Sequence, residues 1–273
     1  MTILIPIDFS SRSTNALQYA AAMAADYRGD IHLVHVVSSG SLNDEDYLQQ
    51  RARVLPKLHI LQQNVWEDFG IRTSFDIVAG IVTKEIINLA ETMKPDLIVM
   101  ASRGANSLSS ALLGSNTATV MEISAIPVLA VPAGCIYSQP ARIVFGTDNE
   151  CTDIPKIIAL INFANLQNST IEVVHIVNRF GDEDEDDDRG LRNVERFRSD
   201  LRQSVNYPFI HCEEYQHTDV AEGMLCFVEE QNADLLVLSS KNRPLVDRLV
   251  RGNINNEFAY QLEVPLLCLH DEN

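Results

Sequence analysis

Positive charge is scarce in this 273-residue chain. Lys and Arg number 21 against 38 Asp and Glu, which gives a formal net charge of −17 at pH 7. Nonspecific binding to DNA, RNA or anionic lipid depends on clustered Lys and Arg, and the composition argues against it. We therefore expect neither a nucleic-acid nor a membrane partner. A single nucleotide held by backbone amides stays compatible with this charge.

Paired cysteines and long apolar runs are also missing. The five cysteines include no C-x-x-C pair, so they form no disulfide framework and fit a reducing cytosol. No stretch reaches 18 apolar residues, and residues 1–8 begin directly with a strand pattern. We expect no membrane span and no signal peptide, and hence a cytoplasmic protein.

Two common nucleotide motifs are absent. No G-x-x-x-x-G-K-[ST] occurs, so no P-loop lysine reaches a terminal phosphate. No G-x-G-x-x-G follows the first apolar run, which argues against a dinucleotide fold of the usual kind.

The chain repeats itself over a long period. The apolar segment around His35 recurs around His175, at an offset of 140 residues (35 to 175). Two more segments recur at an offset of 138, namely 95–102 as 233–240 and 125–129 as 263–267. Solenoid repeats have periods of roughly 20–50 residues, so this period indicates a duplicated domain. We predict domains at 1–134 and 140–273.

Short apolar runs alternate with helical patterns in each half. Residues 3–7 are typical of a strand buried on both faces, Ser10 or Ser11 can cap the next helix, and Gly29 ends it. Pro56 is expected to kink or split the long helix that follows. Further strands are expected at 31–37, 72–78, 96–100 and 127–131, and helices at 43–69, 83–93 and 115–123. This alternation predicts α/β domains, each with a parallel sheet and helices on both faces.

The second half contains a run of seven acids at 182–188. Like charges repel, so we expect a mobile, solvated loop there. The run lacks the glycine turn and ligand spacing of a Ca²⁺ site. His35 and His175 occupy equivalent strand positions and are expected to make structural hydrogen bonds.

Ligands of open parallel sheets bind at the carboxyl ends of the strands. In the first half, residues 6–8 and the segment 101–117 end at that edge. The second segment suits phosphate, because glycines permit close backbone approach and positive φ, and a helix amino terminus attracts anions. Its candidate residues are Arg103, Gly104, Gly114, Ser115, Asn116 and Thr117.

Five strings follow one another in a familiar order. They are Ile-Pro-Ile-Asp-Phe-Ser, Val-His-Val-Val, Asp-Leu-Ile-Val-Met, Gly-x9-Gly-Ser and Ile-Pro-Val-Leu-Ala-Val. This order resembles the universal stress protein family, and both halves match. The resemblance implies two tandem doubly wound domains, each a five-stranded sheet of order 3-2-1-4-5. It also implies an intramolecular pseudo-dimer through the last strands, Val128–Val131 and Leu266–Leu269, and possible further association as a homodimer.

Nucleotide-binding members of that family carry G-x2-G-x9-G-[ST]. The matching string here begins at Ala101, so the first glycine is replaced while Gly104, Gly114 and Ser115 are kept. By resemblance, Asp8 contacts the ribose or adenine, Pro6 and Ile7 line the pocket, and the backbone of Val36 faces adenine. The aligned string in the second half, 239–253, keeps one of the three glycines, so we expect little or no nucleotide binding there.

The leading hypothesis is a stress-response sensor or adaptor that binds ATP, ADP or AMP in its first domain without efficient turnover. Mg²⁺ or Mn²⁺ would bridge the phosphates without a protein ligand, and a signalling protein would be the partner. One alternative is an interaction module that binds no nucleotide, which Ala101 and the altered second loop favour. Another is a nucleotidyl transferase, which the scarcity of nearby cations disfavours.

Overall fold

The chain folds into two compact units, which are described separately. The computed structural model describes residues 1–38, 44–102, 114–148, 153–165, 168–177, 187–239 and 262–270. One unit comprises Met1–Ser138 with His270, and the other Gln139–Leu269. In both units every described strand pair is parallel.

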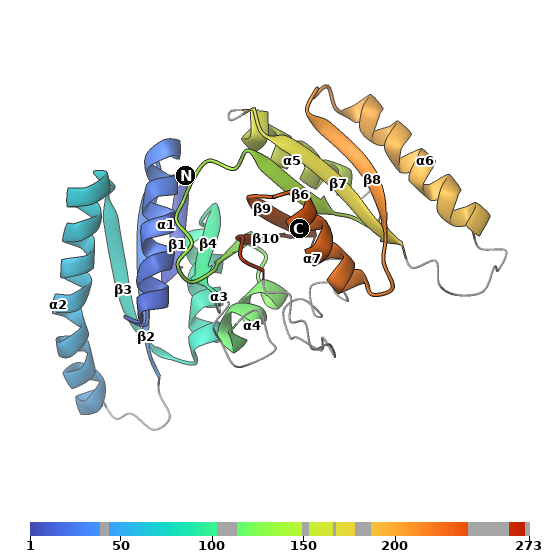
Figure 1. Ribbon diagram of the computed structural model, residues 1–273. Coiled ribbons are helices and arrows are strands. Elements are labelled where there is room, and N and C mark those ends of the chain that lie inside the picture. Colours follow the sequence, from blue (N-terminus) through green and yellow to red (C-terminus); the bar gives the residue numbers. More distant parts are fainter. Residues whose placement is uncertain are drawn as a thin grey trace. The chain divides into compact units, whose positions relative to one another are not determined.

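The first unit alternates strands and helices along the whole of its length (Figure 1). Its elements are β1 (Thr2–Pro6), α1 (Ser11–Tyr27), β2 (Asp30–Ser38), α2 (Asp44–Phe69), β3 (Thr73–Gly80), α3 (Val82–Met93), β4 (Leu97–Ala101), α4 (Ser115–Ile123) and β5 (Val128–Val131). The strands lie in the order β3-β2-β1-β4-β5. The predicted order 3-2-1-4-5 is therefore confirmed.

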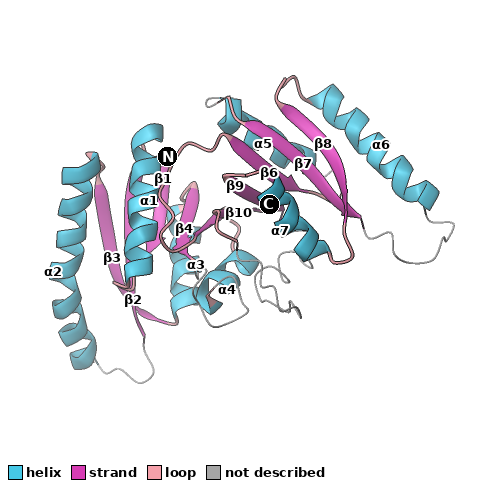
Figure 2. Ribbon diagram, in the orientation of Figure 1, coloured by secondary structure: helices cyan, strands magenta, loops and turns pink. Residues whose placement is uncertain are grey.

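Helices cover both faces of this sheet (Figure 2). Helix α1 packs with α2, and α3 packs with α4. The chain moves from β1 to β2 to β3 toward one edge of the sheet, and then from β4 to β5 toward the other edge. Because the crossovers are right-handed, α1 and α2 lie on one face and α3 and α4 on the other. Three consecutive residues of β1, Ile3, Leu4 and Ile5, are fully buried, as expected of a strand covered on both faces.

The second unit repeats this plan. Its elements are β6 (Arg142–Gly146), α5 (Ile154–Asn165), β7 (Thr170–Val177), α6 (Asp187–Ser204), β8 (Ile210–Gln216), α7 (Val220–Glu230), β9 (Leu235–Ser239) and β10 (Leu266–Leu269). Their order is β10-β9-β6-β7-β8. Strand β6 occupies the position of β1, and β9 that of β4.

Helix α1 begins as the sequence predicts but ends one residue early. Ser10 is the N-cap, and its hydroxyl accepts a hydrogen bond from the Ser13 amide. The left-handed residue at the other end is Arg28, with φ 51°, and not Gly29. Glycine is required at 29 for another reason, because a Cβ there would come within 2.8 Å of the Met1 carbonyl oxygen.

Two other expectations need correction. Helix α2 runs without interruption from Asp44 to Phe69, so Pro56 does not split it. The acidic run was expected to form a loop, but Asp187 and Asp188 open helix α6. Residues 182–186 lie outside the described part of the chain.

None of the helices in the described ranges combines the length and apolarity needed to cross a lipid bilayer.

Candidate functional site

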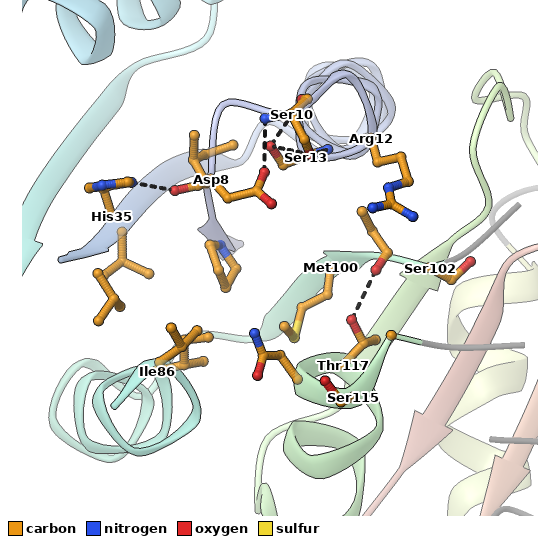
Figure 3. A pocket seen from close by; sticks show the side chains of 18 residues that line it. Asp8, Ser10, Arg12, Ser13, His35, Ile86, Met100, Ser102, Ser115 and Thr117 are labelled. Carbon is orange, nitrogen blue, oxygen red and sulfur yellow. Dashed lines mark hydrogen bonds between the residues drawn. The ribbon is translucent and has the colours of Figure 1, made fainter. Parts of the chain in front are cut away.

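A cavity of about 270 Å³ opens at the carboxyl ends of β1 and β4 (Figure 3). These strands are neighbours, yet the helices that follow them, α1 and α4, cover opposite faces of the sheet. The chain therefore diverges at this point and leaves a crevice between the two helix amino termini. The volume lies just below the usual range for small-molecule sites, roughly 300–1,000 Å³.

The nine predicted site residues within the described ranges all border this cavity. They are Pro6, Ile7, Asp8, Val36, Ala101, Gly114, Ser115, Asn116 and Thr117. Arg103 and Gly104 fall in the segment 103–113, outside the described residues. The sheet topology thus brings together two segments that are about a hundred residues apart in sequence.

One wall comes from the turn between β1 and α1. The Ser10 amide donates a hydrogen bond of 2.9 Å to the Asp8 carboxylate, and the Ser13 hydroxyl donates one of 3.1 Å to the Ser10 carbonyl oxygen. Partial burial alone would raise the pKa of Asp8. Hydrogen bonds from Ser10 and Ser13 outweigh that effect and hold the pKa below its usual value. Asp8 is therefore an ionised hydrogen-bond acceptor at neutral pH.

Replacing Ser10 with alanine should weaken this wall. We expect the free energy of unfolding to fall by about 1 kcal/mol, because the Ser13 amide loses its capping oxygen. The pKa of Asp8 should rise, because one of the hydrogen bonds that lower it disappears. Urea denaturation and a carbon-13 NMR titration of the carboxyl measure the two effects. Ser11→Ala, at an exposed position outside the cavity, is the control, and an unchanged pKa in Ser10→Ala would contradict this account.

The opposite wall is the amino terminus of α4. Gly114 is its N-cap and lacks a side chain that could bond the first amides of the helix. Its φ of −68° and ψ of 151° are ordinary extended values, so Gly114 does not use the positive φ that glycine permits. An added Cβ would meet no described heavy atom within 4 Å. Among the described residues, no side chain caps these amides and none lies within 4 Å of a Cβ at Gly114, so this wall is suitable for an anion.

Thr117, whose contact with phosphate stays a prediction, also connects α4 to β4. Its hydroxyl donates a hydrogen bond of 2.9 Å to the Ala101 carbonyl oxygen, and its side chain is buried. That bond fixes α4 to the end of β4, so the hydroxyl proton is not available to a phosphate. Ser115 and Asn116 are exposed at the cavity.

The end of β2 completes the site. The His35 Nδ1 atom donates a hydrogen bond of 2.7 Å to the Ile7 carbonyl oxygen, and the His175 Nδ1 atom donates the equivalent bond of 2.9 Å to Thr147. The hydrogen bonds expected of both histidines are confirmed, and His35 also borders the cavity. In the first unit this bond fixes the end of β1 beside Val36, which borders the cavity.

Sequence reasoning missed several lining residues, and Arg12 is the most important of them. Among the described lining residues it carries the sole permanent positive charge. Figure 3 shows its side chain extending from α1 toward the end of β4, on the side of Ser102. The string Ser-Ser-Arg-Ser at 10–13, two residues after Asp8, was a signal, but a helix pattern alone does not tell which way an exposed side chain turns. Within the described ranges, no three His, Cys, Asp or Glu side chains gather in a way that could hold a metal ion.

The model of the universal stress protein family matches residues 1–132 and again residues 141–270. The chain belongs to the universal stress protein family. Universal stress protein G of Escherichia coli O157:H7 is 33% identical over 143 residues, which cover 48% of this chain and 97% of that protein. Universal stress protein MJ0531 of Methanocaldococcus jannaschii is 29% identical over 140 residues, with coverage of 47% and 80%. These two relatives each match about one repeat.

A solved universal stress protein structure from Archaeoglobus fulgidus matches the whole chain. It covers 100% of this chain and 97% of the other, with a TM-score of 0.72 and 21% identity. At this identity the likeness establishes the tandem fold and no more.

Proposed function

We propose that this universal stress protein binds an adenine nucleotide, ATP foremost, in the cavity of its first unit. It would act in the cytoplasm as a sensor or adaptor without efficient turnover. One observation supports the proposal above the others: a single cavity has the ionised Asp8 carboxylate on one wall and the uncapped amino terminus of α4 on the other. The first is an acceptor for hydroxyl or amino groups, and the second attracts phosphate.

Charge sets the orientation of the ligand. A carboxylate repels phosphate, so Asp8 would bind the nucleoside end, with Pro6, Ile7 and Val36 contributing apolar and backbone contacts. The phosphates would extend toward Gly114 and Ser115, where free amides and the helix dipole favour negative charge. A Mg²⁺ or Mn²⁺ ion would be held through the phosphates, because the described residues offer it no ligand cluster.

Efficient phosphoryl transfer is not part of the proposal. Stabilising the charge of a transferring phosphoryl group requires several precisely placed cations or metal ligands. Among the described residues around this cavity, Arg12 is the one permanent cation, and it is exposed. The pseudo-dimer arrangement, a homodimer and a signalling partner also remain predictions.

Arg12 should distinguish phosphorylated from unphosphorylated ligands. We expect Arg12→Gln to lower the affinity for ATP about 5- to 10-fold, since one exposed charge contact is removed, and to leave the affinity for adenosine unchanged. Isothermal titration with both ligands measures this difference. Arg28→Gln, at the other end of the same helix, removes an equal charge outside the cavity and should have no effect. An equal loss for ATP and adenosine would place Arg12 at the nucleoside instead.

The proposal is tested on the purified full chain. Protein freshly purified without added nucleotide is denatured, and the supernatant is chromatographed for released adenine nucleotides. A second sample, stripped of ligand, is titrated with ATP, ADP and AMP in the presence and absence of Mg²⁺. Micromolar binding of one of them supports the proposal. Absence of both released nucleotide and binding would favour the interaction module that binds no nucleotide, which the alanine at 101 already suggests.

A further inference from the structure

The two units can be compared residue by residue at their crevices. Ile7 and His35 are 28 residues apart, as are Thr147 and His175, and each pair is joined by the same side-chain-to-carbonyl hydrogen bond. The segment from β1 through α1 to β2 therefore has the same length as the segment from β6 through α5 to β7. The first residues of β1 and β6, and those of β2 and β7, are 140 residues apart, and we apply the same offset to the helix between them; an offset of 138 relates β4 to β9.

Four aligned positions change character together. Three of them, Ile7, Ser13 and Ala101, border the cavity of the first unit, and the fourth, Ala16, is buried in α1. In the first unit they hold the apolar Ile7 and Ala16, the small hydroxyl residue Ser13 and Ala101 at the end of β4. In the second unit the corresponding residues are Thr147, Lys156, Asp153 and Ser239.

The four residues of the second unit contact one another. The Thr147 hydroxyl donates a hydrogen bond of 2.7 Å to Oδ2 of Asp153, and Nζ of Lys156 donates one of 2.6 Å to the Ser239 hydroxyl. Nζ of Lys156 also lies 3.9 Å from Oδ1 of Asp153, which makes an ion pair. The network thus links the ends of β6 and β9 to the first turn of α5.

This network is deeply buried. Lys156 is 7% exposed, Asp153 is 4% exposed and Ser239 is 1% exposed. Buried charges are stable when they are paired and hydrogen-bonded, and each partner here meets that condition. The nearby Cys268 does not compete for the ammonium group, because burial raises the pKa of its thiol to about 12 although Lys156 acts in the opposite direction.

We propose that the side chains of Lys156 and Asp153 occupy the second crevice, which is the space at the carboxyl ends of β6 and β9. This crevice therefore accepts no nucleotide. In the first unit the ends of β1 and β4 border an open cavity, whereas here the protein's own side chains join the ends of β6 and β9. An isolated buried lysine could be interpreted as a phosphate-binding residue. Lys156 is already neutralised by Asp153, so a phosphate would have to break the ion pair and displace the Ser239 hydrogen bond.

The consequence is an asymmetric tandem protein with one ligand site per chain. The second unit is stabilised internally and needs no ligand, whereas the first has an open crevice that a ligand can stabilise. This inference concerns the second unit and does not depend on the identity of the ligand in the first.

The first test measures the accessibility of Lys156 in the full chain. Brief acetylation of lysines with acetic anhydride, followed by mass spectrometry, should modify Lys156 at least about 10-fold more slowly than the exposed Lys84 and Lys94, because the buried ammonium is paired. Modification of Lys156 as fast as Lys94 would overturn the proposal.

The second test separates the ion pair from simple packing. Lys156→Met leaves Asp153 buried without its charge partner, so the thermal midpoint of the second unit should fall by about 10 °C or more. Hydrogen exchange of peptides from β6 and β9 monitors this unfolding. The double variant Asp153→Ser with Lys156→Ala introduces the residues of the first unit at these two positions. It should recover most of the lost thermal stability. If Lys156→Met does not fold, the double variant should still fold. A double variant less stable than Lys156→Met, or no loss in Lys156→Met, contradicts the proposal.

The third test is the stoichiometry of ATP binding. One ATP per chain, with hydrogen-exchange protection confined to the first unit, agrees with a filled second crevice, whereas two per chain would refute it. If no ATP binds at all, the nucleotide proposal for the first unit fails. Acetylation and thermal unfolding then still decide whether Lys156 and Asp153 fill the second crevice.

Discussion

Gly114→Val is expected to lower the affinity for ATP at least about 100-fold, which corresponds to about 2.7 kcal/mol. The backbone at Gly114 has φ −68° and ψ 151°, which valine adopts without strain, and an added Cβ meets no described atom within 4 Å. The fold should therefore tolerate the change. The branched side chain would instead occupy the space beside the first amides of α4, where we place the phosphates.

The control for this prediction lies on the same helix. Thr119 is half-buried on α4 and does not border the cavity, so Thr119→Val should leave ATP binding unchanged. Gly114→Ala should give an intermediate loss, since its side chain is smaller. Binding is measured by isothermal titration and folding by circular dichroism. If Gly114→Val folds and binds ATP normally, the phosphates do not lie against α4.

The largest loss of stability is expected from Phe145→Ala. Phe145 is 0% exposed in β6, the central strand of the second unit, where it pairs with Val173 of β7 and Val237 of β9. Truncating a fully buried phenylalanine removes its apolar contacts and leaves a cavity, which costs about 3–5 kcal/mol of unfolding free energy. Urea denaturation, with hydrogen exchange in β6, measures that cost.

Phe209→Ala is the matched control because Phe209 lies in the same unit and is 44% exposed. Its loss should stay below about 1 kcal/mol, as is usual for surface positions. Similar losses in the two variants would mean that β6 is not at the centre of the core.

Much of the fold could be predicted from local patterns. The apolar run of β1 and the boundaries of α4, Ser115–Ile123, agree with expectation because each depends on burial period and capping along a short segment. The end of α1 was misplaced because Gly29 is needed for a close approach to Met1, a contact between residues far apart in the chain.

The residues of the candidate site could be predicted only in part. Its two main segments carry recognisable residues, and strand topology explains why they meet. The sequence did not predict that Arg12 borders the cavity, because an exposed side chain on a helix can point in many directions. The hydrogen bond from the Thr117 hydroxyl to the Ala101 carbonyl oxygen could not be predicted, because periodicity does not reveal which backbone carbonyl a hydroxyl meets.

By itself, the sequence determined that this protein is a duplicated α/β chain, and it predicted a phosphate-binding segment in the first copy. Repetition, hydrophobic period and motif spacing are properties of order along the chain, so they can be read without coordinates. Only the tertiary structure decided what lies in each crevice. In the first unit there is an open cavity beside Asp8, and in the second there is the Lys156–Asp153 ion pair. The physical reason is that a buried charge is stable only with partners, and folding brings these partners to it from separate elements of the chain.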